Sequence, residues 1–94
     1  TTSLSDERHK ENIVPVTDAL DIVDSINGVF YNLKKLPEKR SVGVIAQNVE
    51  QVLPEVVYEA DGFKSVAYGN IVGVLVEAIK ELRKEIKDLK GGIQ

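Results

Sequence analysis

The fold is decided by residues 71–93, which read IVGVLVEAIKELRKEIKDLKGGI. Apolar residues recur here at alternating intervals of three and four, which is the heptad repeat of a coiled-coil helix. We call this row of heptad positions a and d the seam. Position a holds Val72, Ile79, Ile86 and Ile93, and position d holds Leu75, Leu82 and Leu89. The spacing predicts one long helix over residues 72–93 that takes part in a coiled coil.

The surroundings of the seam change near residue 80. Before it, further apolar residues widen the stripe: Ile71, Val74, Val76 and Ala78. After it, all positions outside the seam are charged as far as Lys90. We expect the first half to pack into its own globular domain and the second half to project and pair with copies of itself. The alternative is an amphipathic helix that lies on the same domain.

The seam also carries information on the number and direction of strands. β-branched residues at position a with leucine at position d favour two strands in isolated coiled coils. Glu85 at position g and Lys90 at the following position e suit a parallel arrangement, because they would meet across the interface.

The rest of the chain predicts short elements around this helix. Residues 17–28 form a helix capped by Thr17 and ended by Asn-Gly, and residues 29–33 form a strand. Residues 34–41 read as a charged loop. A further helix carries Ile45, Val49, Val52 and Leu53 and stops before Pro54, and a hairpin turns at residues 60–62, where Gly62 can adopt positive φ. The fold class is α+β, mainly helical, with one small globular domain.

Composition excludes several classes of function. The chain of 94 residues has a net charge of -3, which argues against nucleic acid as a partner. It has no cysteine, and its single histidine, His9, cannot build a histidine-based metal site alone. No apolar run reaches the roughly 18 residues of a membrane span. We therefore expect no metal, no cofactor and no membrane partner.

The opening segment, SLSDERHK at residues 3–10, allows two interpretations. Ser5 could cap a helix, with acidic residues in the first turn. Alternatively Ser5 is a nucleophile and Lys10 its base, provided that Lys10 is partly desolvated. Five residues of regular helix rotate the chain by about 500°, so this pair requires a bent segment or a lysine from a neighbouring subunit. His9 shares a helical face with Ser5 and is the rival base if the segment is helical.

Four motifs in order identify a family resemblance. They are S-D-x-R-x-K-x-N-I at residues 5–13, G-V-I-A-Q-x-V-E at 43–50, L-P-E-V-V at 53–57 and a helix that follows Tyr68. Together they resemble the C-terminal intramolecular chaperone domain of phage tail fibres, tailspikes and endosialidases. The same module resembles the self-cleaving domain of the myelin regulatory factor family.

The resemblance implies a homotrimer that templates an upstream fibre shaft of the same chain and then cuts itself off. Residues 1–5 would be the stub of the fibre and residues 6–94 the chaperone domain, with folding in the host cytoplasm before the virion is complete. Contacts of the globular part would then decide for three strands over two. The alternative is a structural trimerisation cap that never cuts.

The resemblance also implies roles for residues near the cut. Ser5 matches the nucleophile, Lys10 the base of a serine–lysine dyad, and Asp6 the residue after the Ser5–Asp6 bond that is cut. Attack by Ser5 on the preceding carbonyl would instead break the bond before Ser5. The remaining residues of the motif are candidates for support: Arg8, His9 and Asn12. His9 occupies a position at which the motif allows any residue.

Overall fold

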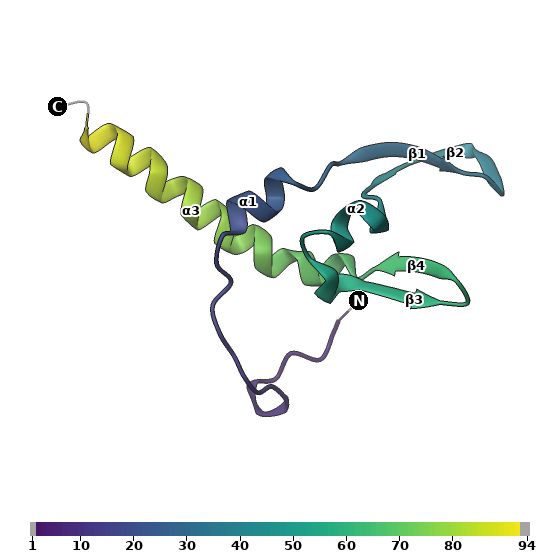
Figure 1. Ribbon diagram of the computed structural model, residues 1–94, viewed down its shortest axis with the longest axis horizontal. Coiled ribbons are helices and arrows are strands. Elements are labelled where there is room, and N and C mark those ends of the chain that lie inside the picture. The colour runs from purple at the N-terminus through teal and green to yellow at the C-terminus, as the bar shows by residue number, and fades with distance from the viewer. Residues whose placement is uncertain (1, 93–94) are drawn as a thin grey trace.

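The computed structural model describes residues 2–92 and has the α+β character expected from the sequence (Figure 1). Two small antiparallel hairpins and two short helices gather around one end of a long C-terminal helix, α3, and the opposite end of α3 projects (Figure 1). The elements in chain order are η1 Glu7–His9, α1 Ala19–Asp24, β1 Val29–Leu33, β2 Leu36–Gly43, α2 Ala46–Glu50, η2 Pro54–Val56, β3 Val57–Ala60, β4 Phe63–Val66, η3 Tyr68–Asn70 and α3 Ile71–Gly91.

Helix α3 has one face that is buried in the domain and one that is exposed. Val74 and Ala78 are buried and form a cluster with Ala19 of α1, while the described seam residues are exposed. Past Glu81, which is half-buried, every described residue of the helix is exposed. This agrees with the expectation that the first half packs into the domain and the second half projects. Ile93, the last predicted seam residue, lies outside the described residues.

The start of α1 differs from the prediction. Asp18, not Thr17, takes the N-cap position, with a left-handed backbone (φ 56°) and no hydrogen bond from its side chain to the helix. The cap comes instead from Glu81, whose carboxylate accepts the backbone N–H groups of Ala19 at 2.9 Å and Leu20 at 3.0 Å. These hydrogen bonds hold the pKa of Glu81 below its usual range. A contact between residues 62 positions apart therefore replaces the local cap.

The prediction of a loop over residues 34–41 is wrong. Residues 36–43 form strand β2, which pairs antiparallel with β1 and places Phe30 opposite Val42. The side chain of Asn32 ties the turn, because its amide donates to the carbonyls of Pro37 at 2.8 Å and Lys39 at 3.1 Å. Most of β2 is exposed, so its sequence lacks the alternation of a strand that covers a core.

The second hairpin follows the prediction. β3 and β4 turn at Asp61 and Gly62, both with positive φ (53° and 82°). Helix α2 is shorter than its apolar pattern suggested, and it packs against this hairpin. Val49 of α2 is fully buried, and an ion pair between Lys64 and Glu50 joins β4 to α2.

The single chain exposes more surface than a compact domain of its size. Its accessible surface is 8106 Å², whereas a folded monomer of 10.4 kDa exposes about 5,400 Å². Its radius of gyration is 16.9 Å, against about 12 Å for a compact domain of this length. Among residues 2–92, the buried apolar residues are Ala19, Val49, Val56, Val74 and Ala78. This surface excess of about 2,700 Å² is of the size that a permanent assembly buries.

Candidate functional site

The segment between Ser5 and Lys10 is a tight turn and not an α-helix. Asp6 caps the 3-10 turn η1, because its carboxylate accepts the backbone N–H of Arg8 at 2.9 Å. The guanidinium of Arg8 donates to both oxygens of the same carboxylate, from Nε at 3.1 Å and from Nη2 at 2.9 Å. The interpretation of Ser5 as a helix cap is therefore wrong. The bonds from Arg8 hold the pKa of Asp6 below its usual range.

This turn brings Ser5 and Lys10 together. Lys10 follows η1 in an extended conformation (φ −119°, ψ 146°), and its Nζ donates to Ser5 Oγ at 2.8 Å. The bend is the geometry that five-residue spacing requires. Within residues 2–92, neither His9 nor Asn12 forms a hydrogen bond with this pair. Asn12 has a left-handed backbone (φ 56°), which bends the chain just after the pair.

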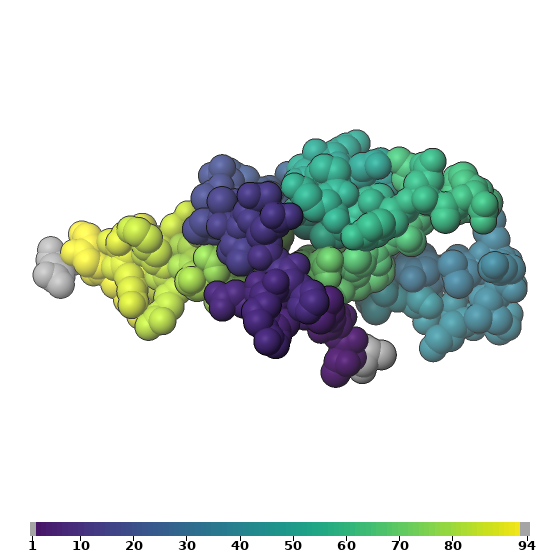
Figure 2. Space-filling view, turned by 90° about the horizontal axis from the view of Figure 1, so that it is seen from below, coloured from purple at the N-terminus to yellow at the C-terminus, as the bar shows by residue number. Residues whose placement is uncertain are grey.

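The Ser5–Lys10 pair lies in a surface cavity of about 570 Å³ against the beginning of α3. In Figure 2 the purple N-terminal segment lies beside the green start of this helix. The cavity is lined by Ser3, Leu4, Ser5, Lys10, Gly69, Asn70, Val72 and Gly73. Both side chains of the pair remain exposed to solvent in the single chain. Val72 is at once a wall of this cavity and the first residue of the seam, so the two candidate functional features share a boundary.

The seam is open along its described length. Its residues keep between 44% and 69% of their surface exposed: Val72, Leu75, Ile79, Leu82, Ile86 and Leu89. Glu85 and Lys90, which flank it, are exposed as well. A row of exposed leucine and β-branched residues on one helix is a surface suited to other helices of the same kind.

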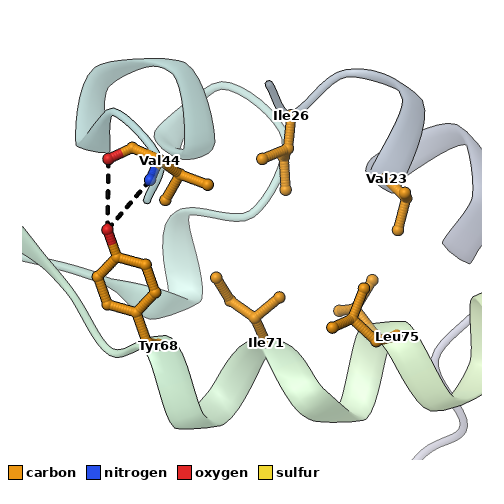
Figure 3. A pocket seen from close by; sticks show the side chains of 7 residues that line it. Val23, Ile26, Val44, Tyr68, Ile71 and Leu75 are labelled. Atoms are coloured by element: carbon orange, nitrogen blue, oxygen red, sulfur yellow. Dashed lines mark hydrogen bonds between the residues drawn. The ribbon is translucent and has the colours of Figure 1, made fainter. Parts of the chain in front are cut away.

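A second, apolar pocket was not predicted from the sequence (Figure 3). It has a volume of about 280 Å³ and lies between α1, the start of α3 and the segment after β2. Its lining residues are Val23, Ile26, Val44, Tyr68, Ile71, Val74 and Leu75. At one wall, the Tyr68 hydroxyl accepts the N–H of Val44 at 3.1 Å and donates to its carbonyl at 3.4 Å.

The close approach of Tyr68 explains one glycine. A Cβ atom at Gly43 would collide with the Tyr68 hydroxyl, so any larger residue would displace this wall. A glycine within a strand can mark such an approach, and Gly43 is the only signal in the sequence that could have indicated the pocket.

Two other kinds of site are not found in the part of the chain that the structure covers. Among residues 2–92, no group of three or more His, Cys, Asp or Glu side chains could hold a metal ion. None of the described helices is both long and apolar enough to cross a membrane.

Comparisons with known proteins agree with the motifs. A family described as chaperone of endosialidase matches residues 5–58. The long tail fiber protein Gp37 of Enterobacteria phage K3 is 35% identical over 95 residues, which cover 92% of this chain and 8% of that protein. Gp37 of Salmonella phage S16 is 34% identical over 104 residues, covering 92% of this chain and 14% of that protein. Gp37 of Enterobacteria phage M1 is 45% identical over 56 residues, covering 55% and 22%. The chain thus spans less than a quarter of the length of these relatives.

Proposed function

Because the chain belongs to the chaperone of endosialidase family, we propose that it is the C-terminal intramolecular chaperone of a phage tail fibre or tailspike and releases itself by one autoproteolytic cut at Ser5. The similarity to long tail fibre proteins supports the proposal that this domain belongs to a tail fibre. Residues 6–94 would be the chaperone domain and residues 1–5 the end of the upstream shaft, and folding would take place in the host cytoplasm. The observation that supports the proposed cut is the hydrogen bond from Lys10 Nζ to Ser5 Oγ.

Three chains assemble in parallel through the seam. The open seam and the surface excess of the single chain support an assembly of this kind. Glu85 and Lys90 of adjacent chains lie opposite each other only in the parallel arrangement. The number three comes from the family resemblance, because the a and d residues by themselves favour two strands.

Ser5 and Lys10 perform the cut. Neutral Lys10 accepts the hydroxyl proton of Ser5, whose Oγ becomes a nucleophile. If Oγ attacks the carbonyl of Leu4, an ester forms, the protonated lysine gives its proton to the leaving amine, and water then hydrolyses the ester. This route breaks Leu4–Ser5. The family resemblance instead implies a cut between Ser5 and Asp6, which needs another nucleophile such as water, because Ser5 attacking its own carbonyl would close a four-membered ring.

Assembly controls the cut. A lysine is a base only when neutral, which requires that water be partly removed from it, and Lys10 is exposed in the single chain. Val72 connects the cavity with the seam, so chains that pack along the seam also cover the edge of the cavity. The cut therefore follows correct trimer formation and reports on it.

The test uses a precursor that carries upstream shaft sequence. Ser5→Ala should abolish the cut and still permit assembly. Lys10→Ala should stop or strongly slow it, and Lys10→Arg should not rescue it, because arginine stays charged. His9→Ala is the matched control and should cut nearly as fast as the wild type. Denaturing gels give the rates, and fragment masses identify the bond. A full rate in Lys10→Ala would refute the role of Lys10.

The second candidate function is a trimerisation cap that never cuts. The exposure of Ser5 and Lys10 favours it, because an exposed lysine is a poor base. In this case the wild-type precursor stays intact after it has formed trimers.

A further inference from the structure

We propose that the apolar pocket between α1 and α3 is a socket for Val76 of the partner subunit. The proposal rests on the parallel assembly proposed above and names a contact outside its seam. It assigns a role to a cavity and to an exposed valine that the seam leaves unexplained.

Val76 is the unusual residue of its heptad position. It lies at position e, as do Arg83 and Lys90, but it is apolar where they are charged. It keeps 48% of its surface exposed, so its own chain does not bury it. Position e borders a coiled-coil seam, and an apolar residue there widens the surface offered to a neighbouring helix.

The heptad register aims Val76 at the pocket. In a parallel coiled coil, a residue at position g lies beside the position e that is five residues further along the neighbouring helix. Ile71 is at position g, and its counterpart is residue 76 of the partner. Ile71, Val74 and Leu75 form the α3 wall of the pocket. Of these, Ile71 and Leu75 lie toward the seam, at positions g and d (Figure 3). The pocket therefore opens on the flank of α3 that meets the partner's Val76.

The chemistry of the pocket fits an aliphatic side chain. Aliphatic groups from α1 and α3 face each other across it (Figure 3). Its polar wall is already satisfied, because the Tyr68 hydroxyl and the backbone of Val44 bond to each other. An incoming valine would displace water without leaving a donor or acceptor unpaired. The volume of about 280 Å³ is large enough for a valine side chain.

The same geometry closes a ring. Each chain presents the pocket on the position g flank of α3 and Val76 on the opposite flank, position e. Such head-to-tail contacts form a closed ring when the rotation between chains permits. The socket is continuous with the seam, because Leu75 belongs to both. A second copy of this chain is therefore the occupant to which the proposal commits.

The decisive experiment is chemical cross-linking in a chain that contains no cysteine of its own. The variant Ile71→Cys with Val76→Cys should form covalent trimers with a short bismaleimide. The matched control, Ile71→Cys with Arg83→Cys, moves the second thiol one heptad along the same flank, about 10 Å away. It should give at least tenfold less covalent trimer. The single-cysteine variants identify links between like positions.

A second measurement tests the same contact through the concentration dependence of assembly. Val76→Glu should raise the concentration at which half the chains are assembled at least tenfold, whereas Lys80→Glu, at the outer position b, should change it less than twofold. Circular dichroism is used to check that each variant folds. If the wild type is trimeric, but both cysteine pairs link equally and Val76→Glu assembles normally, the socket is wrong and another occupant fills the pocket. If the wild type is monomeric at all concentrations, the proposed trimer itself is wrong.

Discussion

Replacing Ile86 and Leu89 by lysine should weaken assembly by acting on the seam alone. Both residues belong to the projecting half of α3, where side chains past Glu81 are exposed. Lysine is a good helix former, and a cation near the C-terminus of a helix is favourable, so the helix itself should persist. Any loss should therefore come from the seam.

The size of the effect follows from the exposed fractions. Ile86 keeps 45% of its surface exposed and Leu89 keeps 69%. Full burial of such a side chain stabilises by about 1.5–3 kcal/mol, so the exposed fractions represent roughly 2–3 kcal/mol per chain and about 5–10 kcal/mol per trimer. Because the midpoint concentration of a trimer depends on the square root of its dissociation constant, 5 kcal/mol raises that midpoint about 70-fold.

The assay combines sedimentation equilibrium over a range of concentrations with hydrogen exchange in the two hairpins. The variant should be monomeric where the wild type is trimeric, and hydrogen exchange measured where both proteins are fully assembled should show equal protection of the hairpins. The control replaces Lys84 and Lys87, at outer positions f and b, by glutamate and should assemble like the wild type. Loss of hairpin protection under these conditions would show that the last turns of α3 belong to the core. An unchanged midpoint would show that the seam is not the interface.

Three further predictions concern the globular part. Gly43→Ala should destabilise the chain by about 1–3 kcal/mol in urea denaturation, because the new methyl group displaces Tyr68, whereas Gly73→Ala, which has no atom within 4 Å of its new Cβ, should stabilise by about 0.5–1 kcal/mol. Glu81→Gln should lower the melting temperature at pH 7. It should also remove part of the acid sensitivity, because a lowered folded-state pKa gives stability that is present above the ordinary glutamate value of about 4.3 and is lost as pH falls through the lower folded value. Gly62→Ala should cost about 1 kcal/mol in denaturant, because alanine is strained at φ 82°.

Periodic apolar spacing predicted α3 well, because one side of this helix covers the core. The turn residues predicted the second hairpin, because Asp61 and Gly62 both adopt positive φ. The same reasoning failed at β2, where most side chains are exposed and backbone pairing with β1 holds the strand. It also failed at the start of α1, because the cap comes from Glu81, and no local pattern reports a contact over 62 positions.

The candidate site, too, was predicted only in part. The spacing of Ser5 and Lys10 indicated that a regular helix could not join them, and the structure joins them through a bend. The cause of that bend, the pairing of Arg8 with Asp6, was not predicted, because an acidic residue after a serine also suits an ordinary helix start. The position of the pair against α3 depends on packing between distant segments, which sequence spacing alone does not describe.

The small buried core of the single chain has a kinetic consequence. Ordering the backbone costs about 1–2 kcal/mol per residue, and a core of Ala19, Val49, Val56, Val74 and Ala78 offsets little of it. If three chains assemble as proposed, folding is a reaction of order higher than one and slows on dilution. Nascent chains on one messenger RNA are held close together, at a raised effective concentration. Trimers would then form preferentially from chains of the same message, so two alleles expressed in one cell would yield mostly unmixed trimers.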